Sequence, residues 1–177
     1  MLYERKIFGE LSKRIEDKEI VVLTGMRRVG KTTLFRMLFD KIESKNKVFF
    51  DIENPLNQKI FEEEDYDNIW ANLKAFRINN KEKAYIFIDE IQSKPEIIKV
   101  IKYLYDHYNV KFFLTGSSSF YLKNLFPESL AGRKIIFELY PLDFEEFLLF
   151  KEHKKKFFEE FRSKDKNKNK IEYEKTK

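Results

Sequence analysis

An eight-residue motif near the N-terminus constrains the fold more than any other feature of this chain. Residues 25–32 read GMRRVGKT and match the pattern G-x-x-x-x-G-K-[ST] at every fixed position. The apolar run IVVLT at 20–24 leads directly into the motif, and residues 33–42 have the pattern of a mostly buried helix. A strand, a glycine loop and a helix in this order are typical of a phosphate-binding loop. The sequence therefore predicts a nucleotide site within an α/β fold.

Each residue type in this motif has a chemical reason to be there. The glycines allow consecutive backbone N–H groups to face a phosphate, and the N-terminus of the following helix adds its positive dipole. We expect Lys31 to bridge the β- and γ-phosphates as a catalytic residue and the Thr32 hydroxyl to bind Mg²⁺. The residues expected to hold the nucleotide are Gly25, Met26, Arg27, Arg28, Val29, Gly30, Lys31, Thr32 and Thr33.

The rest of the chain alternates short apolar runs with amphipathic stretches. The runs at 20–24, 47–52, 84–88, 110–114 and 134–139 are apolar on both faces, as expected for strands of a parallel sheet that is covered on both sides. Helical spacing of apolar residues occurs around 8–15, at 33–42, 66–76 and 95–108, and again after Pro141. Strands that alternate with helices predict a three-layer α/β fold.

Two acidic residues, Asp89 and Glu90, end the apolar run AYIFI at 84–88. Ligands of open α/β sheets bind at the carboxyl ends of the strands, so Asp89 is placed to hold a metal ion. Glu90 is then suited to act as the base for an attacking water molecule. A surface acid pair at a strand end is the alternative. A kinase has no need of this second acid, so the pair favours hydrolysis.

Two further residues are candidates for contact with the γ-phosphate, one after the fourth apolar run and one before the fifth. Ser117, in the cluster TGSSS, is expected to orient the attacking water or contact the γ-phosphate, although a serine-rich turn that caps a helix explains it equally well. Arg133, in the segment SLAGR, is expected to stabilise γ-phosphate charge in its own subunit or across an interface. An ion pair with a surface acid is the alternative for Arg133.

Four segments in this order carry a resemblance to a known family: VVLTGMRRVGKTTL, YIFIDEIQ, FFLTGSSS and SLAGRKIIFELYPLDFEEFL. Over about residues 1–150 the chain resembles the AAA-superfamily ATP-binding proteins of archaea and bacteria. The resemblance implies a parallel sheet of strand order 5-1-4-3-2 and the ligands ATP and Mg²⁺. It also implies that Lys31, Thr32, Asp89 and Glu90 have the roles argued above, with Gln92 as a further part of the pattern.

Composition excludes several other classes of function. The chain has 177 residues with no cysteine and two histidines, which excludes a disulfide framework, a thiolate zinc site and a thiol nucleophile. No apolar run approaches the roughly 18–20 residues of a membrane span. The start is charged from its fourth residue, unlike a signal peptide. We therefore expect a cytoplasmic protein with no membrane partner.

The basic character of the chain is concentrated in its last residues. Residues 151–177 contain eleven basic and six acidic side chains, whereas the net charge of +5 leaves residues 1–150 neutral. We expect a nucleotide domain at 1–150 and a charged helical extension with a lysine-rich, disordered tail at 151–177. Acids interrupt the basic run and no aromatic platform accompanies it, so nucleic-acid binding by the tail is the less favoured interpretation.

Members of the resembled family usually continue into a larger C-terminal domain. The chain ends without one, so we expect a truncated form or a minimal form whose further domain is supplied elsewhere. Two functions fit these features: an ATPase that remodels an unknown protein or nucleic-acid partner, or a nucleotide-dependent switch with negligible turnover. A homo-oligomer is compatible with both.

Overall fold

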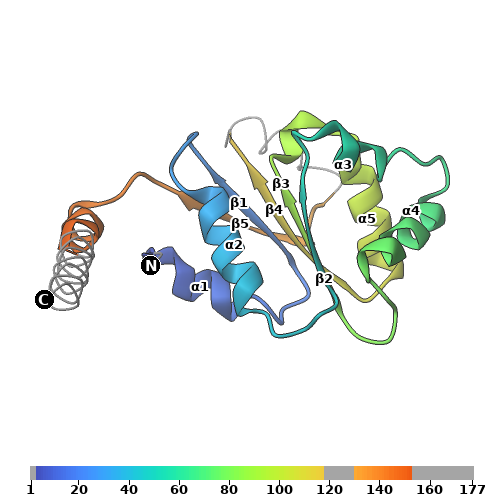
Figure 1. Cartoon of the computed structure of the whole chain (residues 1–177), viewed down its shortest axis with the longest axis horizontal. Coiled ribbons are helices and arrows are strands. Elements are labelled where there is room, and N and C mark those ends of the chain that lie inside the picture. Colours follow the sequence, from blue (N-terminus) through green and yellow to red (C-terminus); the bar gives the residue numbers. More distant parts are fainter. Residues whose placement is uncertain (1–2, 118–129, 153–177) are drawn as a thin grey trace, which may run out of the picture. The chain divides into compact units, whose positions relative to one another are not determined.

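The computed structural model describes residues 3–117 and 130–152, and its centre is a five-stranded parallel sheet (Figure 1). The strands are β1 (Ile20–Gly25), β2 (Lys47–Asp51), β3 (Ala84–Asp89), β4 (Val110–Gly116) and β5 (Lys134–Leu139). Their spatial order is β2-β3-β4-β1-β5, which confirms the order implied by the family resemblance. Each predicted strand begins at its predicted residue, and the ends differ by at most two residues.

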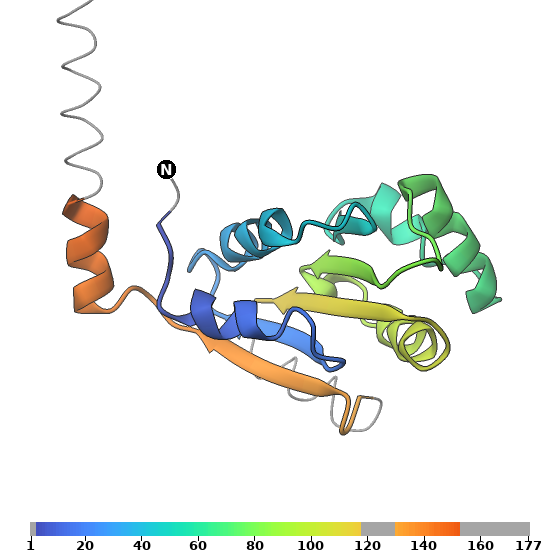
Figure 2. The same cartoon turned by 90° about the horizontal axis from the view of Figure 1, so that it is seen from below.

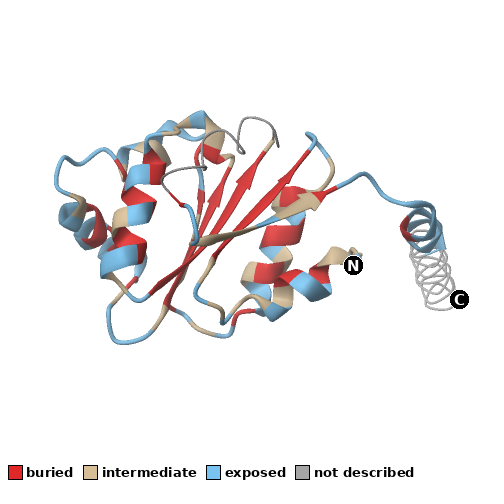
Figure 3. Cartoon of the chain, turned by 180° about the vertical axis from the view of Figure 1, so that it is seen from behind, coloured by how far each residue is buried: buried red, intermediate tan, exposed pale blue. Residues whose placement is uncertain are grey.

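The three inner strands are buried along their whole length (Figure 3). Successive side chains of a strand point to opposite faces of the sheet, so both faces need cover. Helices α1 (Ile7–Lys13) and α2 (Lys31–Lys41) pack on one face, and α4 (Tyr66–Leu73) and α5 (Ile97–His107) pack on the other. Figure 2 shows α2 and α5 on opposite sides of the twisted sheet. This arrangement confirms the predicted three layers.

Aromatic rings form the core between the sheet and α2. Phe87 of β3 and Phe113 of β4 are register partners, and their rings stack with centroids 4.3 Å apart. Phe35 of α2 meets both rings edge-on, at 5.6 Å and 6.0 Å. Such pairs contribute about 0.5–1.5 kcal/mol beyond the area that they bury. The helix that follows the glycine loop is thereby fixed to the two central strands.

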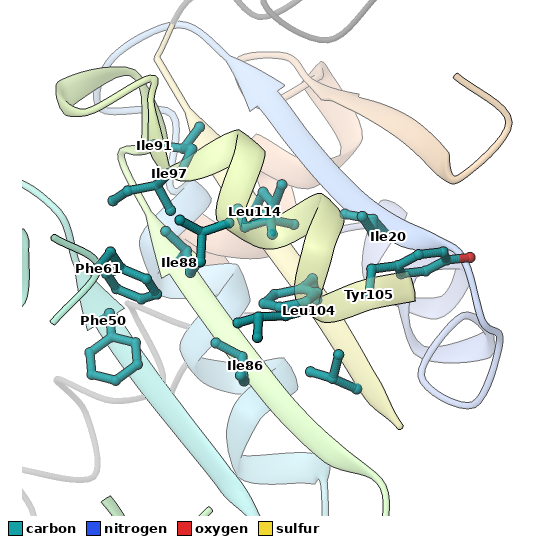
Figure 4. Close-up of a cluster of buried hydrophobic side chains, with 14 of the residues drawn as sticks. Ile20, Phe50, Phe61, Ile86, Ile88, Ile91, Ile97, Leu104, Tyr105 and Leu114 are labelled. Carbon is teal, nitrogen blue, oxygen red and sulfur yellow. The ribbon is translucent and has the colours of Figure 1, made fainter. Parts of the chain in front are cut away.

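Aliphatic side chains dominate the core on the other face (Figure 4). Ile86 and Ile88 of β3 and Leu114 of β4 face Ile97 and Leu104 of α5 in this cluster. All five are at most 1% exposed. The spacing of apolar residues along α5 places them on the buried side of the helix.

Short elements at the sheet edges were not anticipated from the sequence. Helix α3 (Pro55–Lys59) buries no residue, and the 3₁₀ helix η2 (Ile91–Ser93) follows the acidic pair directly. The predicted helix at 66–76 ends as α-helix at Leu73 and continues as the 3₁₀ helix η1 (Lys74–Phe76). None of these elements has the length that a periodic pattern needs to be recognised.

A second compact unit is separate from the body Lys6–Pro141, and its described part consists of residues 3–5 and 142–152. Residues 144–152 are helical, as predicted after Pro141. The backbone N–H of Glu146 donates to Asp143 Oδ1 at 2.8 Å, and Glu146 Oε2 accepts from the Asp143 N–H at 3.2 Å. This reciprocal pair confirms the capping box that Asp143 and Glu146 predict. Arg5 also forms an ion pair with Glu146 at 2.9 Å.

Most of the predicted extension at 151–177 lies outside the described residues. In the part of the chain that the structure does describe, no helix is long and apolar enough to cross a membrane.

Candidate functional site

The glycine motif forms the turn between β1 and α2. Gly25 has φ 149°, and a Cβ atom on it would lie 2.2 Å from the Leu139 carbonyl oxygen of β5. Gly30 has φ 102° and occupies the N-cap position of α2. A side chain is excluded by space at Gly25 and strained by the backbone at Gly30, so the loop requires glycine at both.

Lys31 begins α2 and is 4% exposed. Its ammonium donates to the carbonyl oxygens of Gly25 at 3.1 Å and Met26 at 2.9 Å, across the mouth of the loop. Burial lowers the pKa of Lys31, and the negative charges of Glu90 and Asp89 act against this shift. The loop carbonyls therefore hold the lysine, and the acidic pair lies near enough for its charge to act on it.

Asp89 ends β3 and is 3% exposed. Its carboxylate accepts hydrogen bonds from the hydroxyls of Thr115 and Thr32. Burial raises the pKa of Asp89, whereas these two bonds favour the charged form. Thr32 and Asp89, the two predicted metal ligands, thus come together in the structure.

Glu90 has an unusual backbone conformation, with φ 55° and ψ 47°. A left-handed conformation is uncommon outside glycine and costs of the order of 1 kcal/mol. Thr115 of β4 supports it, because the Glu90 N–H donates to Thr115 Oγ1 at 3.0 Å. One buried threonine hydroxyl therefore holds both acidic residues.

The side chains of Glu90 and Ser117 meet through Gln92 of η2. The Gln92 amide nitrogen donates to Glu90 Oε2 and, at 2.9 Å, to Ser117 Oγ. The Ser117 N–H donates to Gln92 Oε1 at 3.3 Å. Ser117 follows Gly116, the register partner of Thr24 on β1, and so lies near the glycine loop.

The other predicted loop residues line the same turn. Met26, Arg27 and Arg28 are exposed, Val29 is half-buried, and Thr33 is exposed on the first turn of α2. Arg28 has φ 65°, so a residue other than glycine also has a positive φ in this loop, besides Gly25 and Gly30. The two arginines place positive charge at the mouth of the loop.

Arg133 does not come to this edge of the sheet, which corrects the expectation that it acts on phosphate in its own subunit. Its carbonyl oxygen accepts from the N–H of Ile20, the first residue of β1, whereas the loop follows Gly25, the last. At about 3.3 Å per residue, the two ends of β1 are roughly 16 Å apart. The guanidinium instead donates to both carboxylate oxygens of Asp106, at 2.9 Å and 3.2 Å.

Thr115 is a residue of the site that the sequence did not single out, because three serines, 117–119, follow it and are equally plausible hydroxyl donors. One signal in the sequence was that Thr115 directly follows an apolar run, as Asp89 does. In the structure, the residues just before them, Ile88 and Leu114, are register partners. The role of Gln92 as a link between Glu90 and Ser117 was likewise not visible from spacing.

The donors at this edge fit a nucleotide with Mg²⁺. Among the residues described, no three His, Asp or Glu side chains converge on one point, so a metal ion would complete its shell with phosphate and water oxygens. Mg²⁺ commonly binds in this way, through one or two protein groups. Thr32 and Asp89 would hold the metal ion. Both acceptors of the buried Lys31 ammonium are backbone carbonyl oxygens, so its positive charge suits a phosphate group.

Residues 17–148 match a family model described as an AAA domain. The chain belongs to this family. A relative from Methanocaldococcus jannaschii is 33% identical over 146 residues, which are 78% of this chain and 30% of the relative. A relative from Haemophilus influenzae is 30% identical over 134 residues, 73% of this chain and 33% of the relative. Both are described only as uncharacterized proteins, and this AAA-domain chain spans about a third of their length.

Solved structures show the same fold. The Orc1 protein of Aeropyrum pernix, solved in complex with DNA, matches with a TM-score of 0.62 at 14% identity, over 81% of this chain and 47% of that one. PCH-2 of C. elegans matches with a TM-score of 0.54 at 20% identity, over 81% of this chain and 45% of that one. The shared fold agrees with the family model, which makes this chain an AAA domain with a P-loop, as the sequence predicted.

Proposed function

We propose that this AAA domain binds ATP with Mg²⁺ and hydrolyses the β,γ-phosphate bond. The observation that carries the proposal is that the buried Lys31 lies near enough to Asp89 and Glu90 for their charges to act on its pKa, where β3 ends and the glycine loop begins α2. A phosphate loop alone would suit a kinase equally well. A second acid beside the metal-binding acid favours water as the nucleophile.

The roles of the residues follow from their chemistry. When bound, Mg²⁺ supplies positive charge that neutralises the phosphates. Lys31 leaves the carbonyls of Gly25 and Met26 and donates to the β- and γ-phosphate oxygens. Glu90 accepts one proton of the attacking water, whose oxygen bonds to the γ-phosphorus. The bond from that phosphorus to the bridging oxygen breaks, and the electron pair stays on ADP.

A nucleotide-dependent switch is the second candidate. The observation in its favour is that the Lys31 ammonium is bonded to two loop carbonyls, so nucleotide binding would exchange these bonds for bonds to phosphate and free both carbonyls. Binding alone would then change the surface of the domain, with negligible turnover. Release of phosphate from Mg²⁺-ATP separates the two functions.

Coupling of ATP turnover to the remodelling of a protein or nucleic-acid partner is part of the same proposal. Membership of the AAA-domain family supports it, and one structural neighbour of the same fold was solved in complex with DNA. Addition of DNA to the hydrolysis assay tests the nucleic-acid form of this proposal directly, with stimulated phosphate release as the supporting result.

Titration calorimetry on Lys31→Ala tests nucleotide binding. The variant should lose measurable Mg²⁺-ATP binding, because phosphate charge is left without its buried ammonium, and it should remain folded. Lys41→Ala, at the far end of the same helix, is the matched control and should bind as the wild type does. Tight binding by Lys31→Ala would contradict the assignment of the loop.

A further inference from the structure

The side-chain amide of Gln92 makes three hydrogen bonds to two residues of the site. Its nitrogen donates to Glu90 Oε2 and to Ser117 Oγ, and its oxygen accepts from the Ser117 N–H. Gln92 lies on η2, between β3 and α5, whereas Ser117 follows β4. The amide therefore joins the ends of two neighbouring strands.

The orientation of this amide is fixed by its partners. A carboxylate oxygen only accepts hydrogen bonds, so the nitrogen of Gln92 must face Glu90. A backbone N–H only donates, so the amide oxygen must face the Ser117 backbone. The flipped amide would place an acceptor against the carboxylate and a donor against the N–H. The network thus has one allowed polarity.

This polarity decides what the Ser117 hydroxyl can do. Its oxygen accepts from Gln92 at 2.9 Å, so its own proton points to a different acceptor. Within residues 3–117 and 130–152, Ser117 Oγ donates no hydrogen bond. A hydroxyl held as a donor near the glycine loop is suited to a phosphate oxygen, and such charge-assisted bonds are the stronger class.

The same polarity acts on Glu90. Its Oε2 atom receives the Gln92 donor, which leaves Oε1 to accept from a water molecule. A carboxylate that is fixed by one bond keeps its other oxygen in a defined direction. The left-handed backbone of Glu90, supported by Thr115, restrains the residue from the other side.

We propose that Gln92 is a positioning residue that links recognition of the γ-phosphate to activation of water. It presents the Ser117 hydroxyl as a donor to the γ-phosphate and holds the Glu90 carboxylate with Oε1 toward the attacking water. The inference rests on the proposed function, because it assigns Ser117 and Glu90 to a bound triphosphate. It goes beyond that function, because Gln92 touches neither substrate nor metal.

The test compares Gln92→Leu with wild type in two measurements, the affinities for Mg²⁺-ATP and Mg²⁺-ADP by calorimetry and single-turnover hydrolysis. Only ATP has a γ-phosphate, so the variant should lose about tenfold in ATP affinity relative to ADP affinity. Its hydrolysis rate should also fall, by about tenfold to a hundredfold. The control is Gln58→Leu in α3, which removes an amide that donates to the Ile52 carbonyl oxygen. This control should change neither the affinity ratio nor the hydrolysis rate.

Gln92→Glu is a second variant of nearly the same size. It keeps an oxygen for the Ser117 N–H and removes both donors, so it should repeat the effects of Gln92→Leu even if the leucine disturbs folding. In the double variant Gln92→Leu/Ser117→Ala, the loss of ATP preference should be no larger than the larger loss in the two single variants. The reason is that each change removes the same contact, the one between the Ser117 hydroxyl and the γ-phosphate.

The outcomes separate the inference from the proposed function. An unchanged ATP-to-ADP ratio in both Gln92 variants, equal weakening of ATP and ADP, or fully additive losses would each overturn the inference. A wild type that binds ATP without turnover would overturn hydrolysis, while the affinity ratio would still decide the role of Gln92. A wild type that binds neither nucleotide would overturn both.

Discussion

Lys31 and Lys111 are both buried lysines, but their surroundings suit Lys31 to phosphate binding and Lys111 to a structural role. Lys31 is bonded to carbonyl oxygens that it can exchange for phosphate, at the loop where nucleotide is expected. Lys111 is 0% exposed near the start of β4, and its ammonium donates to the Glu19 carbonyl oxygen. Burial lowers the pKa of Lys111 to about 8, against the opposing charges of Asp17 and Glu19. We therefore expect Lys111, at the amino end of β4, to affect stability and not nucleotide binding.

The shifted pKa of Lys111 predicts a pH dependence of stability. Between pH 8 and 10.5 the unfolded chain holds a proton on this lysine that the folded chain has released, so the free energy of unfolding rises with pH. The gain is at most about 3 kcal/mol from the difference between the two pKa values. Urea denaturation of wild type and Lys111→Met across this range measures it.

The rise in the free energy of unfolding between pH 8 and 10.5 should be present in the wild type and absent from Lys111→Met. Lys18→Met, which removes an exposed lysine from the loop that precedes β1, controls for the loss of one charge. If the free energy of unfolding has the same pH dependence in wild type and Lys111→Met, Lys111 does not titrate between pH 8 and 10.5.

At the scale of elements, the site depends on the ends of β3 and β4 being joined. The Thr115 hydroxyl donates to Asp89 and accepts from the Glu90 N–H, so one side chain of β4 fixes both acids that follow from β3. Strand register places this hydroxyl, because residues one position earlier, Ile88 and Leu114, are partners.

Thr115→Val should therefore impair both stability and chemistry. It leaves the Glu90 N–H without the Thr115 acceptor and removes one of the two hydroxyl donors to the buried Asp89 carboxylate, and an unsatisfied buried group typically costs about 1–3 kcal/mol. The expected hydrolysis rate is at least tenfold lower, because Glu90 loses the bond that holds its backbone. Thr115→Ser keeps the hydroxyl and should retain most of both properties. Urea denaturation and single-turnover hydrolysis check this, and a Val variant as active as the Ser variant would contradict it.

The strands could be predicted from the sequence because a parallel sheet that is covered on both faces leaves little choice of residue. Runs such as AYIFI and VKFFL are apolar at nearly every position, and each appears as a buried strand. The helices α2 and α5 were equally clear from their apolar spacing. Helix α3 escaped because its five residues bury nothing, so no periodic pattern marks it.

The site was predicted less completely, since sequence order does not reveal which hydrogen bonds form. Glu90 and Gln92 are two residues apart, yet their contact depends on the left-handed backbone at Glu90 and on the 3₁₀ helix that follows. Arg133 could have been placed correctly. A residue that immediately precedes a parallel strand lies at the amino end of the sheet, opposite the nucleotide loop.

At the scale of the whole body Lys6–Pro141, the two ends of the parallel sheet have different roles. The carboxyl ends of β1, β3 and β4 carry the glycine loop, the acids and Ser117, whereas the amino ends carry Lys111 and the Arg133–Asp106 pair. Side chains at the amino ends can reach a phosphate only if it is bound by another copy of the chain.

Arg133→Ala distinguishes these possibilities. The variant should keep wild-type single-turnover hydrolysis at low protein concentration, because Arg133 lies at the far end of β1 in its own subunit. Its loss of stability should be below about 1 kcal/mol, as for other partly exposed ion pairs, and Asp106→Ala is the matched control. A role across an interface predicts activity that rises with protein concentration and recovers when Arg133→Ala is mixed with inactive Lys31→Ala. A low activity of Arg133→Ala at every concentration, without recovery on mixing, would contradict this placement.

Glu90→Gln tests most directly whether the acid that follows the metal-binding acid activates water. The change removes one charge at nearly constant shape, and Lys31, Thr32 and Asp89 remain to hold Mg²⁺-ATP. Single-turnover hydrolysis and calorimetric affinity are measured on the same preparations of wild type and variant. We predict that the affinity is retained or increased while the hydrolysis rate falls by about 10²–10⁴-fold, the usual contribution of a general base. Equal hydrolysis rates for the two proteins would contradict the proposed mechanism.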